Sequence, residues 1–497
     1  MNRTLAIATV IGLVSTIGCS HAEPPSVQFS VSLAEGLQPA GNGSRVYVLL
    51  TPGSESEPLF SPAYQQWVVG CDASEGKNGA WLIGNSDRVF PEPLSSLESG
   101  EYTVRAVIDR DPTDWKTGWA GGNHYSSKQT IVLDPSRPAS VELLIEHPIE
   151  EEPFVPTETI HEIRLESKLV SGFLGDAQFL LAALVLPDGY AEGKTEYPTV
   201  YVMPGWGGSH TSLVHGDFQQ LRYGMTGFGR DKVFVFLDHN MKYGAHCFAN
   251  SDVVGPWGEA LVKELIPHIE AEYRVIADGR ARFLTGQSSG GWGALWLQMN
   301  YPESFAGAFA ASPDFVDFRA FGDGLDLYDP SANYFFKSDG RPRTGLRDPK
   351  TGSVLMTSEE AARRQTVALG ADQLTSFEAV FGRPNATGEP QSLVDRSTGA
   401  IDRGVLEDWS RYDLNRILSE RWPEIGPRVK GRLHIWVGGD DDYFLDQAVR
   451  LFAEELNQRD AEAHVEIIPG LGHDAWNDDL RTFMHARIDD ILAEAGY

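Results

Sequence analysis

The chain has 497 residues, of which 41% are hydrophobic and 10% aromatic, so it is neither a disordered nor a low-complexity sequence. At about 100 to 200 residues per domain, this length predicts two to four compact units with a large buried core. The formal net charge of −29 repels phosphate backbones and anionic lipid surfaces. We therefore exclude nucleic acid as a partner and expect neutral or cationic ligands.

Residues 1–22 are typical of a signal peptide. Arg3 precedes the apolar run Leu5–Val14, which is too short to span a bilayer. Ser20-His21-Ala22 offers an ordinary cleavage site, whereas Ile17-Gly18-Cys19 resembles a bacterial lipoprotein box that would place a lipid anchor on Cys19. The sequence therefore predicts export to the periplasm, the medium or the cell surface, and no transmembrane helix.

Residues 24–147 alternate apolar and other residues over short segments separated by turns. This pattern predicts an all-β sandwich of immunoglobulin-like size. The expected strands are Val27–Leu33, Arg45–Leu50, Tyr102–Ile108, Gln129–Leu133 and Val141–Ile145. Trp67, Trp81, Trp115 and Trp119 either stack on carbohydrate or belong to the core and its contacts, and we favour the second interpretation. Residues 148–160, rich in Pro and Glu, form the expected linker.

From residue 161 to 497 short apolar runs alternate with helical patterns, which is typical of a mostly parallel sheet with helices on both faces. The runs are Pro198–Met203, Val233–Leu237, Ala281–Leu284, Ala308–Ala311, Leu433–Val437 and His464–Ile468. Apolar stripes predict core-facing helices at Trp257–Tyr273 and Leu445–Asn457. The alternation stops between about 318 and 430, where we expect an insertion or lid with one helix at Ser358–Ala368.

Gly286-Gln287-Ser288-Ser289-Gly290 is a G-x-S-x-G pattern between an expected strand and an expected helix. A sharp turn at this junction strains the central residue, and the flanking glycines remove side chains that would clash. Ser288 Oγ would then project above the carboxyl edge of the sheet, where the amides at the start of the helix favour negative charge. Ser288 is therefore the candidate nucleophile, the alternative being an incidental serine at a Gly-rich helix start.

A serine hydroxyl needs a base, and the base needs a carboxylate that fixes its tautomer. His473 follows the strand His464–Ile468 in a flexible loop, and it is the best placed of thirteen histidines. The turn after Leu433–Val437 contains Asp440, Asp441 and Asp442 as candidate acids, some of which could merely cap the next helix. The order serine, acid, histidine is the order of an α/β-hydrolase.

A tetrahedral oxyanion needs two N–H donors. The amide of Ser289 is one candidate. The second should come from the Gly-rich segment Pro204–Gly208, whose backbone can approach a ligand closely, although such a turn can also simply join a strand to a helix.

These motifs resemble the esterase family of α/β-hydrolases that includes S-formylglutathione hydrolase, feruloyl esterases and enterochelin esterases. The likeness rests on Tyr201–Gly208, Gly286–Gly291, Gly439-x-x-Asp442-x-Phe444 and Gly472-His473-Asp474-x-Trp476. It implies a triad of Ser288, Asp442 and His473, with the amides of Trp206 and Ser289 as oxyanion donors. Within the aspartate cluster, the family spacing selects Asp442. Pro204 and Ser289 depart from residues common in the family, but the amide donors are retained.

The resemblance implies an exported serine esterase that needs no cofactor or metal and acts on a small-molecule or glycan-linked ester. An acyltransferase with the same triad and a non-catalytic surface binding protein are the alternatives. Asn250–Gly258 could contact substrate or cap a helix, and we favour the cap. Cys71 and Cys247 could form a disulfide or stay free; the sequence leaves this open.

Overall fold

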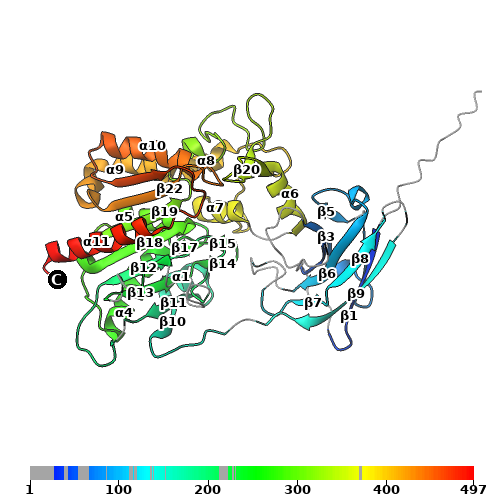
Figure 1. Ribbon diagram of the computed structural model, residues 1–497, viewed down its shortest axis with the longest axis horizontal. Coiled ribbons are helices and arrows are strands. Elements are labelled where there is room, and N and C mark those ends of the chain that lie inside the picture. Colours follow the sequence, from blue (N-terminus) through cyan, green and yellow to red (C-terminus); the bar gives the residue numbers. More distant parts are fainter. Residues whose placement is uncertain are drawn as a thin grey trace, which may run out of the picture.

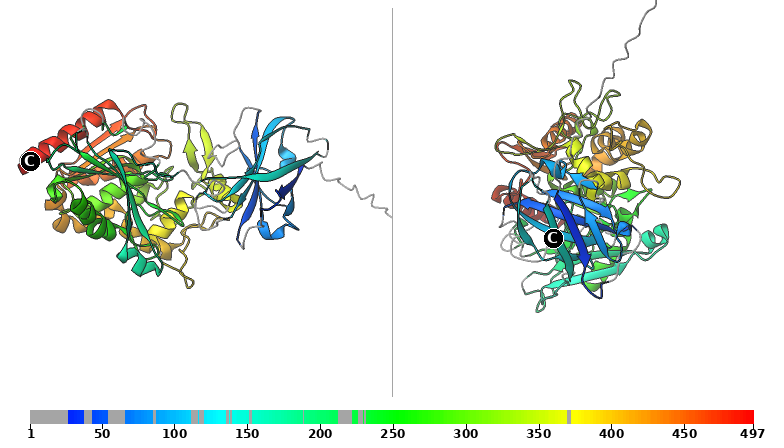
Figure 2. Two further views of the ribbon diagram at one scale, coloured as in Figure 1. Left: turned by 90° about the horizontal axis from the view of Figure 1, so that it is seen from below. Right: turned by 90° about the vertical axis from the view of Figure 1, so that its right-hand side faces the viewer.

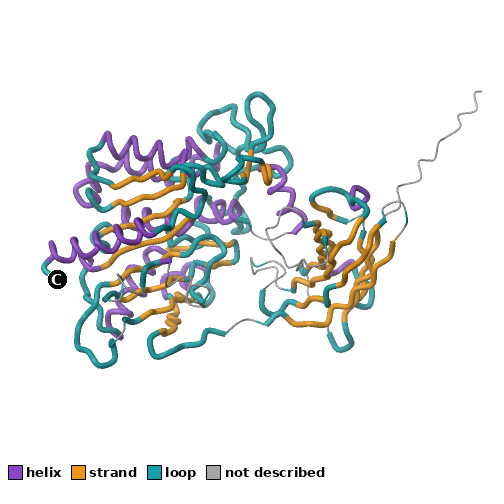
Figure 3. Tube along the Cα trace, in the orientation of Figure 1, coloured by secondary structure: helices purple, strands orange, loops and turns teal. Residues whose placement is uncertain are grey.

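The computed structural model describes residues 27–37, 43–53, 66–84, 87–110, 116, 120–134, 137, 139–150, 153–187, 189–211, 222–225, 229, 231–368 and 372–497. The predicted signal peptide, Cys19, Trp115 and Trp119 lie outside these ranges. A β-rich N-terminal part and a larger α/β part each have their own sheet (Figure 1, Figure 3). Within the described ranges, no helix is long and apolar enough to cross a membrane.

The N-terminal strands form one sheet in the order β4-β1-β9-β7-β6-β2-β3-β5, with β8 also paired to β6. Their bounds are β1 Val27–Leu33, β2 Arg45–Pro52, β3 Trp67–Asp72, β4 Ala80–Ile83, β5 Arg88–Phe90, β6 Gly100–Asp109, β7 His124–Ser126, β8 Gln129–Leu133 and β9 Ala139–Pro148. The strands surround a core that contains Phe29, Val48, Val104 and Leu143. The five predicted strands are confirmed, and β3, β4, β5 and β7 are additional.

The opposite side of this sheet contacts the α/β part. Side chains on the alternate positions of β2, β3, β5 and β6 form a second apolar cluster that includes Val367 of helix α6 (Ser358–Ala368). Arg45 donates to the carbonyl oxygen of Val367 at 3.3 Å, and Arg363 donates to that of Pro91 at 2.6 Å. The β-rich part therefore packs on helix α6 of the expected insertion.

The α/β part contains an eight-stranded sheet in the order β10-β11-β13-β12-β18-β19-β22-β23. Its strands are β10 Ile160–Glu166, β11 Phe179–Val185, β12 Thr199–Met203, β13 Val233–Leu237, β18 Arg282–Ser288, β19 Gly307–Pro313, β22 Leu433–Gly438 and β23 His464–Ile468. The six strands from β13 to β23 pair in parallel, and the β10–β11 and β11–β13 pairs are antiparallel. All six predicted runs are strands.

Helices cover both faces of this sheet because successive side chains alternate between its two faces. Tyr201 and Met203 lie in one core, whereas Val200 and Val202 lie in the other. The first core is completed by α3 (Trp257–Ala260), η3 (Leu261–Leu265), α4 (Ile266–Glu272), α5 (Ser289–Asn300), α9 (Leu414–Val429) and α10 (Leu445–Gln458). The second is completed by α11 (Asp478–Ala495), at the end of the chain (Figure 2).

The predicted helix Trp257–Tyr273 is a continuous run whose middle turn, η3, is a π-helix. Pro267 lies in the first turn of α4 and has no amide hydrogen to donate back to the preceding turn. A π segment is one way in which a helix accommodates such an interruption.

The segment from 318 to 430 contains more regular structure than the single predicted helix. The β20–β21 hairpin (Thr344–Arg347, Val354–Thr357) is followed by α6, α7 (Gln373–Phe381), α8 (Arg403–Trp409) and α9. Helix α9 packs against α5 and α10, so it belongs to the layer that covers the sheet. Short elements elsewhere are α1 Lys168–Leu174, β14 Asn240–Met241, β15 Gly244–Ala245, β16 Asn250–Ser251 and β17 Gly255–Pro256.

Candidate active site

Ser288 lies at the junction of β18 and α5 with φ 57° and ψ −125°. Because positive φ is rare for a residue with a side chain, the backbone is strained at this position. A Cβ atom at Gly290 would run into the carbonyl oxygens of Met203 and Pro204, so only glycine fits there. The sharp turn predicted from the G-x-S-x-G pattern is therefore present, for the predicted steric reason.

Ser288 Oγ donates a hydrogen bond to Oδ1 of Asp314 at 3.0 Å. Asp314 follows the end of β19 and is 3% exposed. Its Oδ2 accepts from Ser289 Oγ at 2.5 Å and from Gln373 Nε2, at the start of α7, at 2.8 Å. Burial raises the pKa of the Asp314 carboxyl group, although these hydrogen bonds oppose the shift. The sequence analysis missed both Asp314 and Gln373.

The ring of His473 contacts Asp441, which corrects the expected pairing with Asp442. His473 Nδ1 lies 2.9 Å from Asp441 Oδ2, and Asp441 is completely buried. The other oxygen of Asp441 accepts from the amides of Tyr443 and Leu445 at 2.9 and 3.2 Å, so it also caps α10. Asp442 is more exposed, and its Oδ1 accepts from the backbone amide of His473 at 3.2 Å.

The electrostatic environment of the His473 ring favours its protonated form. Burial alone lowers the pKa of a histidine, but the hydrogen bond and the charge of Asp441 outweigh it, and Asp314 and Asp442 add to the effect. The net result is a raised pKa. A base in this environment holds a proton more strongly, and the resulting imidazolium is stabilised.

Ser288 and His473 line the same cavity, which has a volume of about 380 Å³. Gln287 Nε2 donates to the carbonyl oxygen of His473 at 2.9 Å and so ties the histidine loop to the serine turn. Among the described residues, Ser288 Oγ bonds to Asp314 and makes no hydrogen bond to the His473 ring. Catalytic hydrogen bonds are often formed only when substrate is bound, so this resting geometry is compatible with a serine–histidine pair.

A second cavity, with a volume of about 210 Å³, also contains Ser288 in its wall. Its lining is largely apolar and includes Phe315, Phe321 and Phe377. Ser358 and Ala361 of α6 lie in the same wall. The insertion therefore builds one side of the space next to Ser288.

Trp206 lies in the loop after β12 and lines the cavity that contains Ser288 and His473. Its indole Nε1 donates to Ser376 Oγ of α7 at 3.0 Å. Ser289 is the first residue of α5, and amides in the first turn of a helix lack acceptors within that helix. The assignment of the amides of Trp206 and Ser289 as oxyanion donors stays a prediction.

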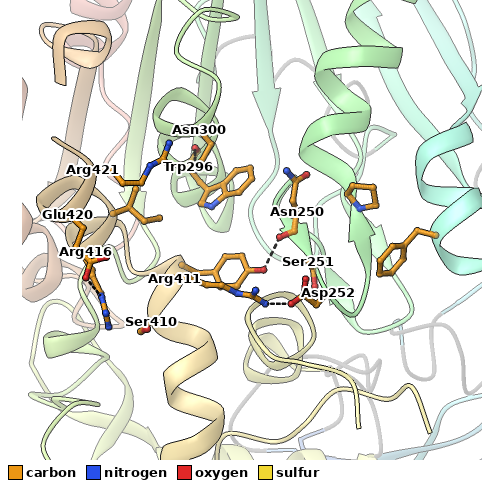
Figure 4. A pocket seen from close by; sticks show the side chains of 14 residues that line it. Asn250, Ser251, Asp252, Trp296, Asn300, Ser410, Arg411, Arg416, Glu420 and Arg421 are labelled. Carbon is orange, nitrogen blue, oxygen red and sulfur yellow. Dashed lines mark hydrogen bonds and ion pairs between the residues drawn. The ribbon is translucent and has the colours of Figure 1, made fainter. Parts of the chain in front are cut away.

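Another cavity, with a volume of about 530 Å³, lies elsewhere (Figure 4). Asn250 and Asp252 line it together with Trp296 and Arg411, and Ser288 is not among its residues. Asn250 Oδ1 accepts from the amide of Glu259 at 2.9 Å, which supports the helix-capping interpretation of this segment.

The favoured core interpretation of Trp67 and Trp81 is confirmed: Trp81 is 4% exposed within the β-rich core, and Trp67 packs against the same core. The sequence left the pairing of Cys71 and Cys247 open, and the structure shows both as buried, free thiols.

The sheet order and the strained serine between β18 and α5 define an α/β-hydrolase fold. The family model described as "Putative esterase" matches residues 180–467, so the chain belongs to this esterase family. An esterase from Mycobacterium tuberculosis is 33% identical over 135 residues, which cover 26% of this chain and 28% of that protein. An endo-1,4-beta-xylanase/feruloyl esterase from Xylanibacter ruminicola is 30% identical over 134 residues, 25% of this chain and 18% of that protein.

The chain thus matches less than a third of the length of these relatives. Among solved structures, a ferulic acid esterase is 15% identical, with 67% of this chain and 96% of that chain covered and a TM-score of 0.41.

Proposed function

We propose that the protein is an exported serine esterase that hydrolyses a carboxylic ester through an acyl-enzyme. Ser288 is the nucleophile, His473 the base and Asp441 the acid. The observation that carries this proposal is the buried Asp441–His473 hydrogen bond in the wall of the cavity that also contains the strained Ser288. Export rests on the sequence of residues 1–22.

In the first half of the reaction, His473 Nε2 takes the hydroxyl proton as Ser288 Oγ bonds to the ester carbonyl carbon. The amides of Trp206 and Ser289 stabilise the oxyanion. The carbon–oxygen bond to the alcohol then breaks, and His473 returns the proton to the leaving oxygen. Water attacks the acyl-enzyme by the same route and releases the acid and the free serine.

The two cavities that meet at Ser288 support a division between acyl and alcohol groups. The apolar walls at Phe315, Phe321 and Phe377 suit an apolar acyl group. The other cavity contains Arg222 and Gln287, which are absent from the first, and their polar groups suit an alcohol with several hydroxyls, such as a sugar. The proposed substrate is therefore a small-molecule or glycan-linked ester with an apolar acyl group.

The test is turnover of p-nitrophenyl acetate by the purified wild-type protein and by Ser288→Ala. We expect a loss of several orders of magnitude in kcat with the folded state unchanged. Wild-type turnover by Ser288→Ala would reject the proposed function. A panel of acetyl, feruloyl and glucuronoyl esters would then identify the acyl group.

A further inference from the structure

Three consecutive residues after β13 hold the loop that follows β12. Because β12 and β13 are parallel neighbours, their carboxyl ends meet at the same edge of the sheet. The contacts are Asp238 Oδ2 to the amide of His210 at 3.2 Å, His239 Nε2 to the carbonyl oxygen of Gly205 at 3.2 Å, and Asn240 Nδ2 to the carbonyl oxygen of Gly208 at 3.0 Å. The backbone of this loop is thus fixed from one side at three points.

Within this group, His239 is a permanent hydrogen-bond donor. A carbonyl oxygen only accepts hydrogen bonds, so Nε2 of His239 carries the proton. The side chain is completely buried, and burial lowers its pKa to about 4. The ring is therefore neutral at ordinary pH, with its proton on the nitrogen that faces Gly205.

The Gly205 carbonyl and the Trp206 N–H belong to one planar peptide group and point in opposite directions. The carbonyl oxygen accepts from His239 and also from the amide of Gly208 at 3.0 Å. Holding this oxygen therefore fixes the direction of the Trp206 N–H. A Cβ atom at Gly205 would lie 3.6 Å from Ser288 Cβ, so this peptide group is directly beside the serine.

The second ring nitrogen of His239, Nδ1, shows that the Nε2 contact is the one that requires a histidine. Nδ1 of His239 is buried and has no hydrogen-bond partner among the described residues. A buried polar atom without a partner destabilises the folded protein, and an apolar side chain of similar size would avoid this cost. The contact with Gly205 is therefore the polar interaction that distinguishes His239 from an apolar residue.

We propose that His239 is a positioning residue that aims the Trp206 N–H at the oxyanion formed on Ser288. This inference rests on the proposed function. In this proposal His239 does not contact the substrate. The side chain acts through the Gly205–Trp206 peptide group, and removing its donor should weaken transition-state stabilisation more than substrate binding.

The test compares His239→Leu, which lacks the donor, with His239→Gln, whose Nε2 can reach the same carbonyl. We expect His239→Leu to lower kcat about 10- to 100-fold with less than a threefold change in KM, since removal of a whole oxyanion donor costs about 10²–10³. The inhibition constant of phenylboronic acid, which forms a tetrahedral adduct with an activated serine, should rise by a similar factor. His239→Gln should recover most of the kcat and the affinity.

His246→Leu is the matched control for loss of stability. His246 is also buried and near His239, but it stacks on Trp257 and accepts from the amide of Phe248. The His246→Leu variant should have a lower melting temperature and a kcat within about threefold of the wild type. Wild-type kcat in His239→Leu, or equal losses in His239→Leu and His246→Leu that follow the melting temperature, would overturn the inference. Full activity of Ser288→Ala would instead reject the proposed function itself.

Discussion

The hydroxyl of Ser288 donates to the buried carboxyl group of Asp314 at 3.0 Å, while the ring of His473 is paired with a different carboxyl group, that of Asp441. The serine and the histidine thus each have their own acidic partner. Two aspartates could in principle serve the reaction, and the contacts assign them different tasks. Asp441 orients the ring of His473, the proposed base, and Asp314 holds the Ser288 hydroxyl together with Ser289 and Gln373.

Substituting the two aspartates in turn should separate these tasks. Asp441→Asn removes the charge that stabilises the imidazolium and the acceptor that orients it, so kcat should fall about a thousandfold or more. Asp314→Asn keeps an oxygen for Ser288 and should change kcat less than about tenfold. Steady-state kinetics on one ester measures both values. The reverse order of losses would identify Asp314 as the catalytic acid.

The pH dependence of kcat/KM should report the raised pKa of His473. The ring must be deprotonated to accept the serine proton, so activity is lost as pH falls through this pKa, and the acidic limb should lie above the ordinary histidine value of 6.5. In Asp441→Asn, burial still lowers the pKa of His473, but the carboxylate that raises this pKa most is gone. The residual activity should therefore extend to lower pH.

Asp442→Asn is the control for this pH experiment, because its amide oxygen can still accept from the amide of His473. The charge of Asp442 contributes less than that of Asp441 to the raised pKa of His473, so this limb should move toward lower pH by less than that of Asp441→Asn. Equal shifts in Asp441→Asn and Asp442→Asn would contradict the assignment of Asp441 to the ring.

Gly290→Ala should both destabilise the protein and impair catalysis. The added methyl group meets the carbonyl oxygens of Met203 and Pro204, which are backbone atoms that cannot turn away. We expect a loss of about 1 to 3 kcal/mol in the free energy of unfolding and at least a tenfold lower kcat, since the turn that carries Ser288 must shift. Chemical denaturation and kinetics provide the two measurements.

Gly172→Ala is its control, since that glycine lies in α1 with open space around it. The alanine should stabilise the protein by at most about 1 kcal/mol. If Gly290→Ala behaved in the same way, the tight fit of the turn would be refuted.

Val367→Asp tests the contact between the β-rich part and α6. Val367 is 7% exposed within an apolar cluster, so burying a charge there should cost about 2 kcal/mol or more. Because α6 also lines the apolar cavity beside Ser288, KM should rise more for esters with large acyl groups than for acetyl esters. Thr366→Asp, at an exposed position of the same helix, should leave both quantities near wild type. Equal KM values in Val367→Asp and wild type would show that the β-rich part does not support this wall.

The sequence predicted those features that depend on local pattern. Continuous apolar runs identified the parallel strands, and the glycines around Ser288 identified its strained turn. The choice between Asp441 and Asp442 was wrong because neighbouring residues of a turn point in different directions, which spacing alone does not give. The start of the next helix at Leu445 was a usable signal, because one oxygen of Asp441 accepts from the Leu445 amide while the other reaches His473.

Asp314 and Gln373 escaped prediction for a different reason. They are 26 and 85 residues beyond Ser288 along the chain, and Gln373 belongs to an insertion without a regular pattern. For Asp314 the sequence did contain a hint, because a charged residue follows the apolar strand Gly307–Pro313 at the edge of the sheet where Ser288 lies.

We propose that His473 activates the Ser288 hydroxyl for attack on a carbonyl carbon. The most direct measurement is mass spectrometry of the intact protein after brief exposure to a fluorophosphonate at neutral pH, followed by peptide mapping. We expect a single adduct on Ser288 in the wild type, none in Ser288→Ala, and labelling slowed by at least a hundredfold in His473→Ala. A wild-type protein that stays unlabelled, or labelling as fast in His473→Ala as in the wild type, would contradict it.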